Sequence, residues 1–295
     1  MSARAMNKPA GILMVFVDGL GTGSEDPAVN PVHSGCCPVL RGLLGRHGTI
    51  DACLGVPGLP QSATGQTALL TGINAAVEAG RHVEGFPGPS LRRIVEKHNI
   101  YKQLDVVNRT STFANAYYVD EMREVSERAI KSVTTVAAMS AFGKVRGKDL
   151  LVANQAVYQD LTREALVPRG YTGPLVTPVE SAEHLVGIAG QYDLTLFEYF
   201  QTDRAGHGGD CKWACRVLGL LDTFLGRIME HVMDGRIRLV LTSDHGNIED
   251  MTTTRHTMAP VPFVAEGREI EYLAGLVRSL TDVTPAIVNM MVGRG

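Results

Sequence analysis

Short, continuous apolar runs alternate along the chain with segments in which apolar residues recur at helical spacing. Residues 12–17 form an uninterrupted apolar run that stops at Asp18 and a glycine loop, a pattern typical of a central parallel strand. Residues 194–200, 237–243 and 261–264 predict three further strands. The predicted strands therefore occur both near the start of the chain and in its last third.

Helices are expected between these strands. From Lys212 to Val232 the apolar residues recur every three or four positions, which predicts a crossover helix with one face in the core. Residues 61–72, 91–98 and 284–291 also predict helices, and residues 101–109 predict another strand. This alternation predicts an α/β fold with a doubly wound, mostly parallel sheet.

The pattern is less regular between residues 118 and 180. A charged helix is expected near residues 120–131, with a solvated face, and a second helix over 150–165, followed by turns rich in glycine and proline. We interpret residues 118–180 as a small insertion or lid in a core formed by residues 1–117 and 181–295.

Composition limits the possible partners and compartments. The chain has 295 residues, with 28 basic and 31 acidic residues, so it has no positive surplus for binding a nucleic acid. No apolar run is long enough to cross a membrane, and five cysteines, two of them adjacent, suit a reduced protein in the cytoplasm. We interpret Cys211 and Cys215, one helical turn apart, as packing residues.

Three aspartates follow predicted strands: Asp18, Asp203 and Asp244. Because the carboxyl ends of parallel strands share one edge of a sheet, these carboxylates are expected to converge, and they would repel one another without a cation. Histidines lie nearby in the sequence at His207, His245 and His256. Carboxylate and imidazole together suit manganese or zinc, and a set of this size predicts a pair of divalent ions.

Two-metal sites are typical of phosphoryl transfer, because the ions clamp the attacking and leaving oxygens. Ser62 lies near the expected start of a helix, where a metal-bound hydroxyl can act as nucleophile and the first amides can hold phosphate oxygens. Thr64 and Thr67 are the competing hydroxyls. The cations nearest in sequence, and hence candidates for substrate binding, are Arg204, Lys212 and Arg255.

Four blocks of sequence carry a resemblance to a known family. They are Val17-Asp-Gly-Leu-Gly21, Gln61-Ser-Ala-Thr-Gly-Gln66, Asp203-Arg-Ala-Gly-His207 and Thr242-Ser-Asp-His-Gly-Asn247, the last followed by His256. Through them the chain resembles the alkaline phosphatase superfamily. Within that superfamily it is similar to the metal-binding core of cofactor-independent phosphoglycerate mutase and phosphopentomutase.

The resemblance implies roles for individual residues. One ion would be held by Asp203, His207 and His256. The other would be held by Asp18, Asp244, His245 and the hydroxyl of Ser62, which would become phosphorylated. The insertion is much smaller than the inserted domain of the mutases. We therefore expect a metal-dependent phosphate monoester hydrolase acting on a small phosphorylated metabolite, with a phosphomutase as the alternative and a non-catalytic metal-stabilised binding module as a second one.

Overall fold

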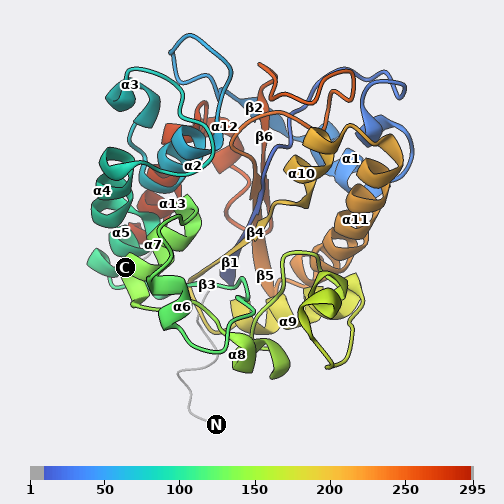
Figure 1. Cartoon of the computed structure of the whole chain (residues 1–295). Helices are drawn as coiled ribbons and strands as arrows, with labels where there is room; N and C mark the ends of the chain where they lie inside the picture. The colour runs from blue at the N-terminus through green and yellow to red at the C-terminus, as the bar shows by residue number, and fades with distance from the viewer. Residues whose placement is uncertain (1–9, 294–295) are drawn as a thin grey trace.

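A six-stranded sheet forms the centre of the protein, as the computed structural model, which describes residues 10–293, shows (Figure 1). Its strand order is β2-β6-β5-β1-β4-β3. The strands are β1 (Gly11–Val17), β2 (Gly48–Ile50), β3 (Ser111–Phe113), β4 (Leu194–Tyr199), β5 (Ile237–Thr242) and β6 (Val261–Glu266). Strand β1 lies between β4 and β5 and is parallel to both, whereas β6 is antiparallel to β5 and to β2. The predicted mostly parallel α/β fold is confirmed.

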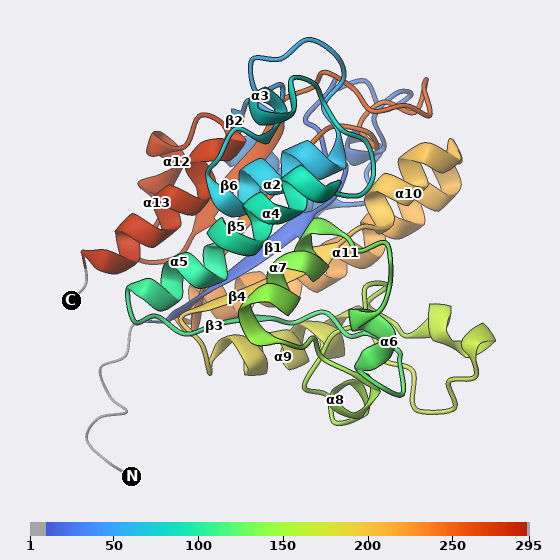
Figure 2. The same cartoon turned by 60° about the vertical axis from the view of Figure 1, so that its left-hand side comes forward.

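Helices cover both faces of the sheet (Figures 1 and 2). One layer contains α2 (Ser62–Thr71), α3 (Ala75–Ala79), α4 (Pro89–His98), α5 (Ile100–Val106), α7 (Val133–Phe142), α12 (Leu273–Leu276) and α13 (Leu280–Val292). The other contains α1 (Pro38–Arg46), α9 (Pro178–Ala189), α10 (Gln201–Gly208) and α11 (Cys211–Met233), with a short 3-10 turn, η2 (Pro31–His33), packed on α11. The expected crossover helix is α11.

The continuous apolar run of β1 is explained by these two layers. Successive side chains of a strand point to opposite faces, so Ile12, Met14 and Phe16 join the core beneath α2 and α13. Leu13 and Val15 join the core beneath α11 on the other side. Every residue of β1, β4 and β5 is buried, and none of these strands has a solvent-facing side that would require alternation.

The strand predicted over residues 101–109 is wrong, because this segment is helix α5. The Asn99 side chain accepts from the backbone N–H of Lys102 and caps the helix, and Ile100 and Leu104 are buried one turn apart. The strand that pairs with β4 is the shorter β3 that follows it. A short apolar segment fits the spacing of a strand as well as that of a helix, and here the helical spacing holds.

Residues 118–180 hold less helix than expected. The charged segment forms only α6 (Arg123–Ser126), and the helix predicted over 150–165 is limited to α8 (Lys148–Val152). Further along, the Asp160 side chain accepts from the backbone N–H of Thr162 and Arg163 and so stabilises a turn within the predicted helix range. A 3-10 helix, η3 (Glu164–Arg169), follows.

This segment contributes to three hydrophobic clusters, because Val157 and Leu161 also join the core beneath α11. Helix α7 packs in the main core through Val133 and Val136. A separate small cluster contains Leu151, Tyr158 and Leu166, and Figure 2 shows the surrounding chain, with α6 and α8, at one end of the molecule. The division into core and insertion at 118–180 stays a prediction.

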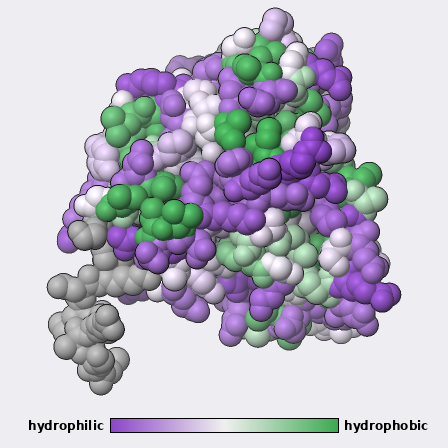
Figure 3. Space-filling model, turned by 90° about the vertical axis from the view of Figure 1, so that its left-hand side faces the viewer, coloured by the Kyte–Doolittle hydropathy of each residue, from purple (hydrophilic) through white to green (hydrophobic). Residues whose placement is uncertain are grey.

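The outer surface is of mixed polarity. On the face that includes α4 and α5, apolar groups are separated by hydrophilic ones (Figure 3). Within residues 10–293, no helix combines the length and the apolar character that a membrane crossing requires.

Candidate metal centre

The three strand-end aspartates meet at one edge of the sheet. Asp18 follows β1, and Asp244 and His245 follow β5, next to β1 in the sheet. Asp203 follows β4, but it lies in the first turn of α10 rather than directly at the strand end. His256 comes from the excursion between β5 and β6 and lies against His245, with their rings stacked 3.7 Å apart.

One group of potential metal ligands consists of Asp18, Asp244 and His245, all of them buried. His245 Nε2 lies 3.3 Å from Asp18 Oδ1 and 3.4 Å from Asp244 Oδ2. The hydroxyl oxygen of Ser62 lies 2.9 Å from the same Nε2 atom. Four donor atoms from three chain segments, the ends of β1 and β5 and the start of α2, therefore surround one point.

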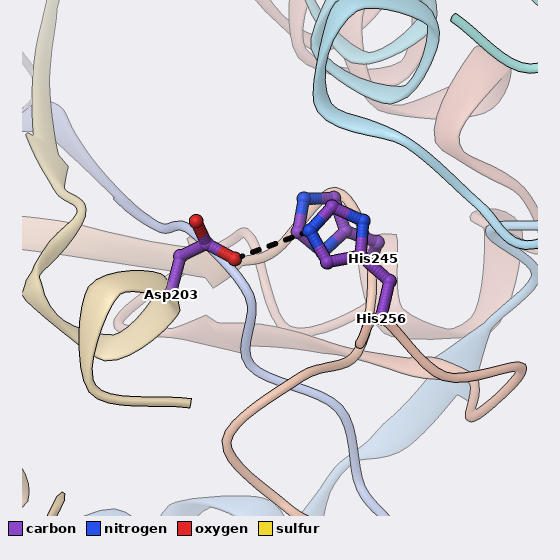
Figure 4. Close-up of side chains that lie close together, drawn as sticks. All are labelled: Asp203, His245 and His256. Atoms are coloured by element: carbon purple, nitrogen blue, oxygen red, sulfur yellow. Dashed lines mark ion pairs between the residues drawn. The ribbon is translucent and has the colours of Figure 1, made fainter. Parts of the chain in front are cut away.

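A second group contains Asp203, His245 and His256 (Figure 4). His256 Nε2 lies 3.4 Å from Asp203 Oδ1, and His207 Nε2 lies at the same distance from that oxygen. His207 Nε2 is also 3.1 Å from His256 Nε2, so His207 closes this group from its solvent side. His245 lies between the two groups.

Backbone carbonyls orient all three imidazoles. The Nδ1 atom of His207 faces the Thr254 carbonyl at 2.8 Å, that of His256 faces the Pro60 carbonyl at 3.0 Å, and that of His245 faces the Gly246 carbonyl at 3.3 Å. An N–H at Nδ1 leaves the Nε2 lone pair directed into the cluster, which is the usual arrangement of a metal-bound histidine. These rings are thus oriented for coordination.

Two buried carboxylate oxygens in this cluster lack a hydrogen-bond donor. Asp18 Oδ2 accepts from Gln66 at 3.2 Å and Asp244 Oδ1 accepts from the Gly19 amide at 3.4 Å, but Asp18 Oδ1 and Asp244 Oδ2 have no partner among the described residues. Buried charged oxygens without donors are costly unless they coordinate a cation. The residues therefore fit a divalent cation.

The pKa shifts of the site residues also fit a bound cation. Burial raises the pKa of Asp18 well above its usual range, and the nearby carboxylates of Asp244 and Asp203 raise it further. Burial opposes ionisation of Asp203, but its hydrogen bonds to His256 and Asn247 and the nearby imidazoles lower its pKa to about 2. Burial lowers the pKa of His245, which keeps its ring neutral and available as a ligand.

Ser62 differs from the competing hydroxyls. It is the first residue of α2, whereas the Thr64 hydroxyl donates to the Gln61 carbonyl at 3.1 Å and the Thr67 hydroxyl donates to the Ala63 carbonyl at 2.6 Å. Gly65 allows α2 to lie close to the loop of Asp244, since a Cβ atom at position 65 would be 2.7 Å from the Asp244 carbonyl oxygen. The sequence block around Ser62 therefore packs α2 directly on the loop of Asp244.

A cavity of about 530 Å³ opens beside Ser62, with Asp18 and Asp203 in its wall. Its lining also includes residues of the 115–169 region, among them three cations, Arg128, Lys131 and Arg169, and three tyrosines, Tyr117, Tyr118 and Tyr158. None of these was singled out from the sequence. Arg128 and Lys131 belong to the charged stretch that the sequence predicts as a solvated face, and Arg169 lies in the turn-rich segment.

The three cations predicted to bind substrate lie in different places in the structure. Arg204 lines the cavity beside Ser62. Arg255 lines a different, more open pocket with Arg81 and His82. Lys212, exposed in the first turn of α11, is not among the described residues that line either pocket. Closeness in sequence to a predicted metal ligand did not place Lys212 or Arg255 among the described residues that line this cavity.

Glu198 is a buried acid in the same cavity that sequence reasoning missed. It lies on β4, and Thr134 donates to its Oε2 atom at 2.6 Å. Burial raises its pKa to about 7, with the charge of Asp244 adding to the effect. Its position in an apolar strand run gave no signal of this role in the sequence.

Comparison with known proteins places the chain in a family. Residues 10–292 match the model of the Metalloenzyme superfamily. The match covers nearly the whole chain, and the protein belongs to this superfamily.

Curated relatives match over a shorter length. The chain is 35% identical over 127 residues to the 2,3-bisphosphoglycerate-independent phosphoglycerate mutase of Thiobacillus denitrificans, covering 40% of this chain and 25% of the relative. It is 34% identical over 128 residues to the enzyme of that name from Acinetobacter baylyi, covering 40% and 24%. The aligned region spans about a quarter of the length of these relatives.

Solved structures share the fold. Alkaline phosphatase from the Antarctic bacterium TAB5 has a TM-score of 0.56 at 13% identity, with 98% of this chain and 100% of that chain covered. A protein from Pyrococcus horikoshii has a TM-score of 0.61 at 14% identity, with 98% of each chain covered. These structures confirm the expected alkaline-phosphatase-like core, and the family match confirms the expected class, a metal-dependent enzyme.

Proposed function

We propose that this protein is a two-metal phosphoryl-transfer enzyme that hydrolyses phosphate monoesters through a phosphorylated Ser62. The observation that carries the proposal is the position of the Ser62 hydroxyl, 2.9 Å from His245 Nε2 at the open end of a buried carboxylate–imidazole cluster. The phosphoglycerate mutase names of the curated relatives support phosphoryl transfer as the chemistry.

In this proposal the ligands divide into two sets. Asp18, Asp244, His245 and Ser62 hold one ion. Asp203, His207 and His256 hold the other. The contacts of 3.3 to 3.4 Å between His245 and the two carboxylates, and of 3.4 Å between Asp203 and the other two histidines, support this division. Oxygen and imidazole ligands without a thiolate suit manganese or zinc.

Ser62 acts as the nucleophile. When bound, the ions would lower the pKa of its hydroxyl, neutralise the phosphate charge and stabilise the departing oxygen. The Ser62 oxygen attacks phosphorus, and the alcohol leaves from the opposite side. Water then attacks the phosphoserine, which releases phosphate and restores the serine hydroxyl.

The start of α2 supports phosphate binding at this point. The first backbone hydrogen bond of α2 runs from the Gly65 N–H to the Gln61 carbonyl at 2.8 Å. The N–H groups that precede Gly65 in the first turn are therefore not used by the hydrogen bonds of the helix. Such amides and the helix dipole favour a phosphate group. Arg204 in the cavity wall adds a positive charge.

A phosphomutase is the second candidate, and the cavity favours it. The 115–169 region contributes cations and tyrosines to the lining of the cavity that contains Ser62, and so helps to enclose it. Keeping the phosphorylated intermediate away from water would allow another substrate hydroxyl to take the phosphate. The two candidates differ in the acceptor and share the first half of the reaction.

The test begins with protein treated with a chelator and reloaded with Mn²⁺, Zn²⁺ or Mg²⁺. An aryl phosphate and a panel of phosphorylated metabolites serve as substrates. Free phosphate as the product supports the hydrolase, and isomer exchange without free phosphate supports the mutase. No turnover with any ion or substrate would favour a metal-stabilised binding module instead.

Two matched variants locate the nucleophile. Ser62→Ala is expected to abolish turnover and phosphoserine formation while leaving the metal content nearly intact. Thr67→Ala removes a hydroxyl from the same helix that is already bonded to a carbonyl and is expected to retain turnover. Full activity in Ser62→Ala would overturn the assignment of the nucleophile.

A further inference from the structure

Three cysteine thiols meet where η2 and the start of α1 pack on α11. The Ser34 hydroxyl oxygen lies 3.4 Å from Cys36 Sγ and 3.3 Å from Cys215 Sγ. Cys37 follows directly in the chain and is buried. None of these residues lines the cavity beside Ser62. Cys215 therefore has thiol neighbours that its position in the sequence did not reveal.

The backbone brings Cys36 directly onto α11. Gly219 lies one helical turn after Cys215, and a Cβ atom there would be 3.5 Å from the Cys36 carbonyl oxygen. The Cys36 thiol, partly exposed, is therefore held over the part of α11 that carries Cys215. A small oxidant has access to it from solvent.

The three thiols differ in acidity. A hydrogen bond from Cys37, together with contacts to Ser34 and Cys215, lowers the pKa of Cys36 to about 6 against the opposing effect of burial. The pKa values of Cys37 and Cys215 are both raised. Asp222, on the same side of α11, faces this cluster and accepts from the Leu40 amide at 2.8 Å.

A disulfide between Cys36 and Cys37 is disfavoured although their side chains are hydrogen-bonded. The Cys37 sulfur lies 3.6 Å from the Val32 carbonyl oxygen, in the core, and the Cys37 backbone caps the start of α1. A disulfide between adjacent cysteines closes a small ring and strains the peptide between them. Cys215 approaches from another element and carries no such constraint.

We infer that Cys36 and Cys215 form a reversible thiol pair that reacts with hydroperoxides. The Cys36 thiolate attacks one peroxide oxygen and becomes a sulfenic acid, and the other oxygen leaves as alkoxide or hydroxide and takes up a proton. The Cys215 thiol then attacks the Cys36 sulfur. A disulfide forms and water leaves, so two thiols are oxidised and one peroxide is reduced.

The experiment treats the full chain with hydrogen peroxide at a molar ratio near one, followed by denaturation, alkylation and peptide mass spectrometry. The thiol count of the denatured protein, five before treatment, is expected to fall by two. The Cys36 and Cys215 peptides are expected to be linked, and dithiothreitol is expected to release them. A Cys36–Cys37 link, or an unchanged thiol count, would overturn the inference.

Variants test the order of the steps. Cys215→Ser is expected to leave a sulfenic acid on Cys36 that dimedone captures, and Cys36→Ser is expected to give neither product. Cys211→Ser removes the exposed thiol one turn earlier on α11 and is expected to form the disulfide as the parent does. Equal loss of the disulfide in Cys211→Ser would contradict the pairing.

The unmodified chain gives an independent measurement. The rate of Cys36 alkylation by iodoacetamide is expected to be half-maximal near pH 6. A midpoint at the ordinary value of a free thiol would contradict the proposal without relying on the folding of any variant.

Discussion

The side-chain amide of Asn247 donates to Asp203 Oδ1 at 2.7 Å and to the Asp203 backbone carbonyl at 3.1 Å. This pair joins the loop after β5 to the first turn of α10. Asn247 is not one of the proposed ligands, yet it fixes the direction in which the Asp203 carboxylate points. It acts as a positioning residue for one half of the centre.

Asn247→Ala is therefore expected to weaken metal binding. Loss of a residue that orients a ligand typically lowers metal affinity by about 10- to 100-fold. Competition with a chelating dye would measure the change. Asn289→Ala on the distant helix α13 is the control, and equal affinity in both variants would show that Asn247 has no role in orientation.

Gly206→Ala tests the same contact from the other side. A Cβ atom at Gly206 would lie 2.3 Å from Asn247 Oδ1, so we expect the substitution to destabilise the fold by about 1–3 kcal/mol. At Gly187, in α9, no heavy atom lies within 4 Å of such a Cβ atom. Gly187→Ala should therefore stabilise by about 0.5–1 kcal/mol. Urea unfolding of both variants decides whether the packing at Gly206 is as tight as described.

The cavity wall leads to a kinetic prediction. Arg128→Ala is expected to raise KM for the best phosphorylated substrate by about tenfold with little change in kcat, because a lost charge-assisted contact weakens ground-state and transition-state binding alike. Arg123→Ala, whose side chain pairs with Glu127 outside the cavity, is the control. A fall in kcat alone would indicate that Arg128 acts on the reaction rather than on binding.

Glu198 predicts a pH dependence of stability in the chelator-treated protein. Its pKa of about 7 in the fold lies above the ordinary value of 4.5, so the folded state holds the proton more tightly than the unfolded state. The stability gained from this proton is complete below pH 4.5 and is lost as the pH rises through 7, by about 3 kcal/mol in total. Glu198→Gln should remove this loss. If the unfolding free energies of the parent protein and of Glu198→Gln fall in parallel between pH 5 and 8, the assignment of this pH dependence to Glu198 is wrong.

Metal removal is expected to lower the melting temperature. Without a cation, the buried carboxylates of Asp18 and Asp244 face each other across His245 with unpaired oxygens. Calorimetry before and after chelation, and after Mn²⁺ or Zn²⁺ is returned, measures the effect. An unchanged melting temperature would argue against a cation at these two residues.

The strands that build the centre could be predicted because they are buried on both faces. The apolar runs of β1, β4 and β5 ended close to Asp18, Asp203 and Asp244, and parallel pairing was enough to bring their ends together. Helix α5 could not be predicted from its apolar residues alone, because a segment this short fits the spacing of a helix and that of a strand. The helix cap at Asn99 distinguishes the two.

Contacts that depend on distant packing could not be read from the sequence. Arg128 and Lys131 belong to a charged stretch whose position over Ser62 follows from the packing of α7 in the core. Asn247 stood inside a quoted motif, but only the placement of α10 shows what its amide contacts. Cys36 and Cys215 meet because η2 packs on α11.

The excursion between β5 and β6 supplies Asp244, His245, Asn247 and His256, and it is anchored at both ends by hydrogen-bonded neighbouring strands. Residues assigned to both proposed ion positions thus lie on a single segment, and His245 belongs to both candidate ligand groups. Any fraying of that hairpin would disable both positions at once, so we expect the two ions to be gained and released as a unit, without a long-lived half-loaded form.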